Sequence, residues 1–542
     1  MENKGRYTIY LPIAFALVLI LGMFLGSKLI LVSSSNGSLS NSIFSFGSNK
    51  YDKLNDVINY IESSYVDSVS KEDLIEKALS GLLTSLDPHS SYIPAAEFNE
   101  ANDPIQGNFD GIGVEFRVVR DTVVVINTID KGPSQKKGVN AGDRIVKVNG
   151  KNIASIKIKD DEVKKLLKGK KGTDVKITVY RSSNNKLLDF TITRDAIPTF
   201  SIDVNYIATG NIGYIKLSKF STTTFDEFDE ALISLKRGGM KKLILDLRGN
   251  GGGLLNSAVN LADEFLTNKK LIVYTEGRNK PKEYYNATEK GLFQQGDIVI
   301  LIDEFSASAS EILAGAIQDN DRGTIIGRRS FGKGLVQEQV SLNDGSAVRL
   351  TVSRYYTPTG RCIQNSYKDG SDEYYNSFYE RFYDGELESV DSIKFPDSLK
   401  YKTPKGKIVY GGGGIMPDIF VPLGKEERTK LYVDLMNKGI FQQFAFEYID
   451  KKRKALKILY KNSNDFIKSF NVSNQMLNEF FLFAIKNGIK NDDKNTNLSE
   501  EIIKAYIKAY IGRNLFDDAG FYPIINSVDK TYLKAIEVLK QM

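Results

Sequence analysis

Two short segments of this 542-residue chain carry residue types that could perform acyl transfer. Ser306-Ala-Ser-Ala-Ser-Glu311 follows an apolar run at 298–302, and Phe331-Gly-Lys-Gly334 comes shortly after it. A serine at a helix N-terminus behind a buried strand is presented to solvent beside free backbone N–H groups, which suits a nucleophile. N-capping is the ordinary role of such a serine. A lysine such as Lys333 serves as a base only when it is neutral, and burial between its flanking glycines would favour that form.

The scarce residues limit the alternative chemistries. The chain has one Cys, one His and no Trp, so an internal disulfide and the usual Cys/His zinc sites are excluded, and we expect neither a metal nor an organic cofactor. His89 follows a predicted helix and stays open as an alternative base, whereas Cys362 is expected to be a buried small hydrophobe. The net charge of +6 is spread along the chain, which gives no support to nucleic-acid binding.

The elements that position these segments follow an α/β pattern. Residues 243–247 and 298–302 are continuous apolar runs, which are typical of strands buried on both faces. Each run leads into a helix with an apolar stripe, and the glycine-rich turn 246–253 follows the first. This turn lacks the Lys-Ser or Lys-Thr of a P-loop, which argues against a phosphate cradle. Chemistry is therefore expected at the two strand-to-helix junctions.

Other patterns predict the flanking domains. Helices are expected at about 51–65 and 71–85, and the second carries a capping-box-like start. Short β-branched runs separated by turns from about 109 to 195 predict a small β-rich module with one helix at 160–168. After Pro422, helical spacing with few breakers predicts a helical C-terminal domain.

The N-terminal residues predict a membrane anchor or a signal peptide. Residues 8–27 form an almost uncharged stretch of spanning length, and Lys4 and Arg6 precede it. A cleaved signal peptide is the alternative. The charge bias places residues 33–542 outside the cytoplasm, so we expect a single-pass inner-membrane protein with its catalytic part in the periplasm, or secretion to the periplasm after signal cleavage.

Taken together, the serine and lysine segments resemble the carboxy-terminal processing, or tail-specific, proteases of serine peptidase family S41. The resemblance lies in Ser-Ala-Ser-Ala-Ser-Glu-Ile-Leu-Ala-Gly-Ala at 306–316, followed by Phe-Gly-Lys-Gly at 331–334. It implies that Ser308 is the nucleophile, that Lys333 is the general base and that Gln337 orients the lysine. The implied enzyme is a serine endopeptidase.

The resemblance also implies an oxyanion hole. One donor would be the backbone N–H of Ala309, directly after the nucleophile, and the other a glycine of the glycine-rich turn, for which Gly253 is the first candidate and Gly252 the second. Ser306 and Ser310 remain the alternatives for the nucleophile.

The β-rich module resembles the PDZ domain of the same family. Phe-Asp-Gly-Ile-Gly-Val at 109–114 is similar to its carboxylate-binding loop, and residues 132–134 and 138–150 are similar to the later PDZ core. Glycines let backbone N–H groups converge on a carboxylate, while an edge strand accepts the peptide. The implied substrate-binding residues are Gly111, Ile112, Gly113 and Val114. The expected partners are proteins or peptides with free C-termini, the inner membrane through the N-terminal segment, and a second copy of the chain or an adaptor.

The implied fold is a multidomain α/β protein with N-terminal helices, a PDZ domain, a crotonase/ClpP-like ββα spiral catalytic core and a helical C-terminal domain. Its expected boundaries are 1–32 for the membrane anchor or signal, 33–49 for a linker, 50–102 for the N-terminal helical segment, 103–196 for the PDZ domain, 197–424 for the catalytic core and 425–542 for the helical C-terminal domain. An insertion at about 365–410 departs from relatives in which this segment is compact.

Two rival interpretations fit the sequence less well. A catalytically inactive scaffold would be expected to lack the serine, the lysine or the glutamine, and all three are present. An acyl-CoA enzyme on the shared crotonase-like fold would leave the PDZ-like module and the Ser-Lys pair unexplained. The stretch 86–94 is also similar to the family's connection between the N-terminal helices and the PDZ domain, which favours a structural role for His89.

Overall fold

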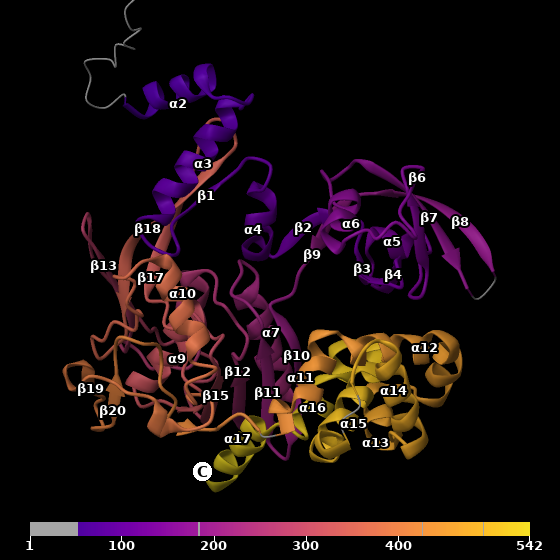
Figure 1. Ribbon diagram of the computed structural model, residues 1–542. Coiled ribbons are helices and arrows are strands. Elements are labelled where there is room, and N and C mark those ends of the chain that lie inside the picture. Colours follow the sequence, from indigo (N-terminus) through magenta and orange to yellow (C-terminus); the bar gives the residue numbers. More distant parts are fainter. Residues whose placement is uncertain (1–52, 183–184, 425, 491–492) are drawn as a thin grey trace, which may run out of the picture. The chain divides into compact units, whose positions relative to one another are not determined.

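The computed structural model describes residues 53–182, 185–424, 426–490 and 493–542 (Figure 1). The predicted membrane segment 8–27 and the linker 33–49 lie outside these residues. No helix in the described part of the chain combines the length and the apolar character that a membrane span requires. The chain divides between Ile75 and Glu76 into two compact units, and the second carries everything discussed below as a site.

The predicted N-terminal helices are confirmed as α2 (Lys53–Ser64) and α3 (Lys71–Thr84). Helix α3 begins after Ser70, whose Oγ accepts from the Asp73 amide at 3.4 Å, and it ends before Pro88 because proline disfavours helix in the preceding residue. Strand β1 (Ser91–Ile93) and helix α4 (Phe98–Gln106) follow. The sequence patterns missed α4, which contains Pro104.

The β-rich module forms a sheet in the order β3-β4-β5-β7-β8, with β6 on β5. Alternating β-branched residues such as Val123, Val125 and Ile145 fill its core. The predicted helix is α6 (Asp160–Leu167). The remaining bounds are β2 (Asn108–Gly111), β3 (Val114–Val119), β4 (Thr122–Thr128), α5 (Pro133–Lys136), β5 (Arg144–Val148), β6 (Lys151–Asn152), β7 (Asp174–Arg181), β8 (Lys186–Thr193) and β9 (Asp195–Pro198), of which β2 and β9 pair with each other.

The predicted catalytic core is built on a six-stranded sheet in the order β10-β11-β12-β15-β16-β21, in which only the β10–β11 pair is antiparallel. The predicted buried strands are β12 (Lys242–Asp246) and β15 (Asp297–Ile302). Each is buried on both faces, which explains its continuous apolar run. The other strands are β10 (Ile202–Thr209), β11 (Ile212–Leu217), β16 (Thr324–Gly327) and β21 (Ile419–Phe420).

Helices cover both faces of this sheet. On one face, α7 (Thr224–Arg237), α8 (Leu255–Asp263) and α9 (Ala309–Asp319) pack on residues such as Leu243 and Ile300. On the other face, α17 (Lys530–Gln541) packs Tyr532, Ala535 and Leu539 against strand residues that include Ile244, Val299 and Leu301. The last helix of the chain is therefore part of the catalytic core.

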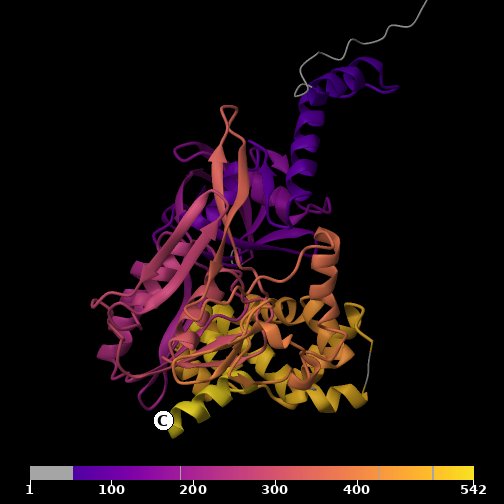
Figure 2. The ribbon, with the colours of Figure 1, turned by 90° about the vertical axis from the view of Figure 1, so that its left-hand side faces the viewer.

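A second sheet borders the first. It has the order β1-β18-β13-β14, with β17 on β18, and Figure 2 shows the β17–β18 and β13–β14 hairpins side by side. The bounds are β13 (Leu271–Gly277), β14 (Lys280–Asn286), β17 (Leu335–Ser341) and β18 (Ala347–Tyr356). Strand β1 pairs with β18 in antiparallel register, Ser91 opposite Arg349, so the stretch around His89 is brought to the catalytic core.

The predicted C-terminal helices are present. They pack around a core of their own that includes Phe441, Phe466, Phe480 and Ile507. Their bounds are α11 (Lys430–Asn437), α12 (Ile440–Leu459), α13 (Ser463–Ser469), α14 (Asn474–Lys486), α15 (Asp493–Phe516) and α16 (Tyr522–Asn526). The predicted helical segment 425–542 thus contributes to two cores, its own and, through α17, that of the catalytic sheet.

Candidate active site

Ser308 is the N-cap residue of α9, in the loop that leaves the buried strand β15. Its φ of 55° is unusual for a residue with a side chain, and such conformations persist where the surroundings over-determine them. The serine lines a cavity of about 420 Å³ together with Lys333, Gln337 and Gly253. Three elements distant in sequence therefore bring the predicted residues to one cavity.

The other two serines of the segment do not line this cavity. Ser306 is fully buried and its Oγ donates to the Leu247 carbonyl at 2.9 Å. Ser310 is fully buried as well, and its Oγ donates to the Asn250 carbonyl at 2.9 Å. Both hydroxyls are committed to the backbone of the glycine-rich turn, which makes them structural and leaves Ser308 as the candidate nucleophile.

Lys333 is partly buried in the turn before β17. Within the described residues, the carboxylates that influence Lys333, Asp87 and Glu311, act on it through charge and not through a side-chain hydrogen bond. Burial lowers the pKa of Lys333, and the nearby Arg349 guanidinium lowers it further, whereas Asp87 and Glu311 act in the opposite direction. The net effect favours the neutral amine that a general base requires. No hydrogen bond joins Lys333 to Ser308 among the described residues, and catalytic hydrogen bonds are often long before substrate binds.

Glu311 links the serine to the lysine turn, a role that the sequence patterns did not predict. It is fully buried, and its Oε2 accepts from the backbone amides of Ser308 at 2.8 Å and Lys333 at 2.9 Å. Its Oε1 accepts from Ser330 Oγ at 2.5 Å and from the Gly332 amide at 2.7 Å. The Ser-x-x-Glu spacing of a capping box was the available signal.

Tyr355 of β18 adds a second tie. It is buried, and its hydroxyl lies 2.8 Å from the Lys333 carbonyl and 3.2 Å from the Ser308 carbonyl. The hydroxyl has one proton, so it donates to one carbonyl at a time. Together with Glu311, it holds the backbones of the two candidate catalytic residues at a fixed separation.

The glycine-rich turn packs directly against the nucleophile. A Cβ at Gly252 would lie 2.8 Å from Ser308 Cβ and 2.9 Å from the Ala309 nitrogen, so only glycine fits there. The Gly252 amide, the second candidate oxyanion donor, donates to Asn250 Oδ1 at 2.9 Å, which favours Gly253, the first candidate. Gly253 lines the cavity, and the amide of Ala309, the first residue of α9, has no intrahelical acceptor.

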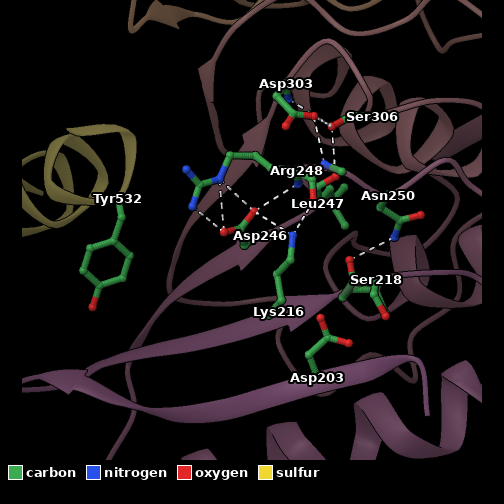
Figure 3. A network of polar contacts seen from close by, with 12 residues as sticks. Asp203, Lys216, Ser218, Asp246, Leu247, Arg248, Asn250, Asp303, Ser306 and Tyr532 are labelled. Carbon is green, nitrogen blue, oxygen red and sulfur yellow. Dashed lines mark hydrogen bonds and ion pairs between the residues drawn. The ribbon is translucent and has the colours of Figure 1, made fainter. Parts of the chain in front are cut away.

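A buried network of charged side chains lies at the start of this turn (Figure 3). Asp246, at the end of β12, accepts from Tyr214 Oη at 2.8 Å and from Arg248 Nη2 at 2.6 Å, and Lys216 Nζ lies 3.4 Å from it. Burial alone would raise the pKa of Asp246, but the charges of Arg248 and Lys216 outweigh it and hold that pKa well below its usual range. Arg248 Nη1 also donates to Asp529 Oδ2 at 2.7 Å, just before α17.

The same network joins the glycine-rich turn to the nucleophile loop. Asp303 Oδ1 accepts from the Gly249 amide at 2.9 Å, and the Asp303 amide donates to Ser306 Oγ at 3.0 Å (Figure 3). The Ala307 amide donates to the Asn250 carbonyl at 3.0 Å. Both sides of the candidate oxyanion hole therefore share one set of hydrogen bonds.

His89 is not placed as a base for Ser308. Its Nε2 lies 3.2 Å from Tyr374 Oη, and no hydrogen bond joins it to Ser308 in the described ranges. Burial, together with the charge of Lys333, lowers the pKa of His89 to about 4, so the imidazole is neutral at neutral pH. A structural role agrees with this position.

The insertion packs on the lysine turn. Helix α10 (Ser371–Glu380) places the Phe378 ring 5.0 Å and the Tyr374 ring 6.0 Å from the ring of Phe331. Tyr374 is buried, and its ring also meets that of His89 edge-on at 5.4 Å. The inserted residues thus shield the backbone that carries Lys333 from solvent on this side.

The predicted carboxylate-binding loop borders a second cavity. All four predicted residues, Gly111, Ile112, Gly113 and Val114, line this groove of about 450 Å³, and Leu167 of α6 lines it as well. Gly113 adopts a φ of 71°, which favours glycine. Strand β3 is the edge strand of its sheet, so the groove has the geometry needed to accept an added peptide strand.

Comparisons with protein families agree with this architecture. The model of Peptidase family S41 matches residues 211–370, that of the PDZ domain matches residues 111–193, and that of the Activating protease CtpB N-terminal domain matches residues 22–96. A family of unknown function, DUF8443, matches residues 431–517, within the C-terminal helices.

The alignments with two curated relatives cover about three quarters of each relative's length. The chain is 38% identical over 351 residues to the carboxy-terminal-processing protease of Bartonella bacilliformis, covering 63% of this chain and 78% of the relative. It is 34% identical over 350 residues to the carboxy-terminal processing protease CtpA of Bacillus subtilis, covering 64% and 74%. Among solved structures, the photosystem II D1 C-terminal processing protease shares 26% identity with a TM-score of 0.36, covering 69% of this chain and 87% of that one.

Proposed function

The chain belongs to peptidase family S41, the carboxy-terminal processing proteases, and from this premise we propose that it cleaves proteins with a Ser308–Lys333 dyad and selects them by their C-terminal tails. The observation that carries the proposal is the shared cavity. Ser308, Lys333 and Gln337 all line it, and burial and Arg349 lower the pKa of the lysine.

In the proposed mechanism, neutral Lys333 accepts the Ser308 hydroxyl proton as Oγ attacks the scissile carbonyl carbon. The carbonyl oxygen becomes an oxyanion that the amides of Ala309 and Gly253 stabilise. The tetrahedral intermediate collapses when the C–N bond breaks and the Lys333 ammonium returns the proton to the leaving amine. Water then attacks the acyl-enzyme, again with Lys333 as base, and releases the acid product and free Ser308.

Tail selection is proposed for the PDZ groove. A peptide added to the β3 edge would place its terminal carboxylate at residues 111–113, where backbone N–H groups can donate charge-assisted hydrogen bonds. The side chains of Ile112, Val114 and Leu167 offer apolar surface to the last residues of the peptide. Attachment to the inner membrane through residues 8–27, with the catalytic part in the periplasm, belongs to the same proposal.

The dyad is tested with Ser308→Ala, Lys333→Ala and Ser310→Ala in a fluorogenic peptide assay, together with labelling by a fluorophosphonate. We expect the first two variants to lose hydrolysis and Ser308→Ala to lose the label, because the covalent pathway needs both groups. Ser310→Ala is the matched serine control and should keep the label. Hydrolysis and labelling that persist in Ser308→Ala but vanish in Ser310→Ala would assign the nucleophile to Ser310.

The rival scaffold interpretation is tested by the same assay. An inactive scaffold would bind peptides in the PDZ groove and hydrolyse none of them at any pH. An acyl-CoA enzyme would turn over thioesters while leaving peptides intact. Hydrolysis of peptides by the wild-type chain, lost in Ser308→Ala, would exclude both.

A further inference from the structure

Gln337 is connected to a buried carboxylate outside the predicted site. Gln337 and Thr351 are directly opposed across the β17–β18 pair, and Gln337 Nε2 donates to Thr351 Oγ1 at 3.3 Å. Thr351 Oγ1 in turn donates to Asp87 Oδ1 at 3.1 Å. Asp87 is 6% exposed and lies before β1, more than two hundred residues away from its threonine partner.

The Asp87 carboxylate determines which group donates in each of these hydrogen bonds. An ionised carboxylate only accepts, so the single proton of the Thr351 hydroxyl is given to Asp87. The hydroxyl oxygen can then only accept from Gln337, which requires the amide NH₂ rather than the amide oxygen on that side. The Oε1 of Gln337 is thereby turned away from Thr351 and remains available as an acceptor.

Asp87 is held in place by several donors. Its Oδ1 accepts from the amides of His89 at 2.8 Å and Ser90 at 2.9 Å, and its Oδ2 accepts from Ser90 Oγ at 2.6 Å. Burial alone would raise the pKa of Asp87, but these hydrogen bonds outweigh it and lower the pKa, so the carboxylate is ionised at neutral pH. Ser90 Oγ also accepts from the Thr351 amide at 3.0 Å, which fixes Asp87 to β18.

The strand itself is shaped for this contact. The β17–β18 register shifts between Val336 and Gln337, and such bulges re-aim the side chain that follows. Gln337 lines the cavity that also contains Ser308 and Lys333. Its free Oε1 is therefore an acceptor at the cavity that contains the lysine.

We propose that Asp87 and Thr351 are positioning residues of the protease, which orient the Gln337 amide so that its oxygen accepts a hydrogen bond from Lys333. Lysine carries its amine on a flexible four-carbon stem, so a base of this type needs a fixed acceptor to hold it in line with the serine. The inference rests on the proposed Ser308–Lys333 dyad, to which it adds two residues from other elements.

The test replaces the threonine hydroxyl. Thr351→Val removes the proton donor to Asp87 and the acceptor for Gln337 while keeping the shape of the side chain, and Thr351→Ser restores the hydroxyl. Thr403→Val is the matched control, because the Oγ1 of Thr403 likewise donates to an aspartate, Asp321, at 2.8 Å, and Thr403 does not line the catalytic cavity. Asp87→Asn attacks the same chain from its other end.

Thr351→Val should lower kcat roughly a hundredfold with KM within about twofold of wild type, since misorientation of a catalytic group has costs of this size. Thr351→Ser should recover most of kcat, and Thr403→Val should behave as wild type. The pH–rate profile supplies a further readout. Loss of an acceptor for the ammonium lowers the pKa of Lys333, so the rise of kcat/KM with pH should begin at a lower pH in Thr351→Val.

The charged neighbours of Lys333 must stay in place for that readout. They are Arg349 on β18, Asp87 and His89 in the loop before β1, and Glu311 on α9, and Thr351→Val leaves all four unchanged. Asp87→Asn removes a charge that raises the pKa of Lys333, so it should shift the profile in the same direction and also lower kcat.

The inference is overturned if Thr351→Val keeps wild-type kcat and pH profile, if Thr351→Ser is impaired as severely as Thr351→Val, or if Thr403→Val loses as much activity. Thermal unfolding of each variant shows whether it is folded, and if Thr351→Val is not, Asp87→Asn decides by the same criteria. Ser308→Ala is measured alongside. Activity in Ser308→Ala would refute the proposed dyad itself, whereas an inactive Ser308→Ala with unaffected Thr351 and Asp87 variants would refute only the positioning role.

Discussion

Glu311→Gln and Glu311→Ala should differ sharply, because the carboxylate serves two pairs of donors. An amide offers one acceptor oxygen and one NH₂ group. If the NH₂ took the place of Oε2, it would face the amides of both Ser308 and Lys333. In the place of Oε1 it faces the Gly332 amide and the Ser330 hydroxyl, and the hydroxyl can turn and accept. The glutamine therefore takes the second orientation and leaves one donor unpaired.

One buried unpaired donor costs about 1–3 kcal/mol, so Glu311→Gln should lose that much stability. Glu311→Ala leaves all four donors unpaired, although it also removes a carboxylate whose burial is unfavourable. Breaking a buried polar network of this kind has a net cost of roughly 3–5 kcal/mol. The glutamine keeps the link between Ser308 and Lys333, so its kcat should fall less than about tenfold, whereas the alanine should lose roughly a hundredfold or more.

Urea unfolding and peptide hydrolysis check both numbers. Burial raises the pKa of Glu311 above the ordinary glutamate range, so the stability present at low pH is lost as the pH rises through that raised pKa, and Glu311→Gln should flatten this dependence. The reasoning is refuted if Glu311→Ala unfolds at the same urea concentration as Glu311→Gln, or if the glutamine variant is the less active of the two.

Three further outcomes are expected. Wild-type kcat/KM should rise with pH through the lowered pKa of Lys333, and chelators and thiol-blocking reagents should not change it. Because the Arg349 guanidinium lowers that pKa, Arg349→Gln should move the rise to higher pH, and an unmoved profile would contradict this. Peptides with a free apolar C-terminus should bind the Ser308→Ala chain more tightly than amidated ones in an anisotropy titration, and equal affinities would show that the PDZ groove does not read the carboxylate. Asp529→Asn should cost about 1–3 kcal/mol in urea unfolding, because a charge-assisted bond to Arg248 is lost while Asp246 still pairs with it; unchanged stability would show that this link contributes nothing.

The central strands of the catalytic sheet could be predicted from the sequence, because parallel strands buried on both faces give continuous apolar runs. Residues 243–247 and 298–302 were recognised on that ground and form β12 and β15. The packing of α17 on the same sheet could not be predicted. Its apolar residues Tyr532, Ala535 and Leu539 recur at helical spacing, and this pattern shows that a helix has a buried face without identifying what covers it.

The residues of the candidate site likewise include some that the sequence could predict and some that it could not. Ser308 and Lys333 stand in short motifs whose residue types and spacing point to the proposed chemistry. Asp87 and Thr351 meet only because β1 adds to β18, and a contact between residues so far apart in sequence leaves no local pattern. Glu311 lies between these cases, since its spacing from Ser308 was visible but its bonds to the lysine turn were not.

The strained backbone at Ser308 explains why so many contacts converge on it. A side-chain-bearing residue at a φ of 55° carries a cost on the order of 1–3 kcal/mol, which the surroundings must offset. Its amide donates to Glu311, its carbonyl lies 3.2 Å from the Tyr355 hydroxyl that also serves the Lys333 carbonyl, and Gly252 approaches its Cβ closely. All of these contacts use atoms that alanine also has, and those to Lys333 likewise use its backbone. The clamp therefore positions both residues without depending on the Ser308 hydroxyl or the Lys333 amine, so replacing either group should remove the proposed chemistry and leave the fold in place.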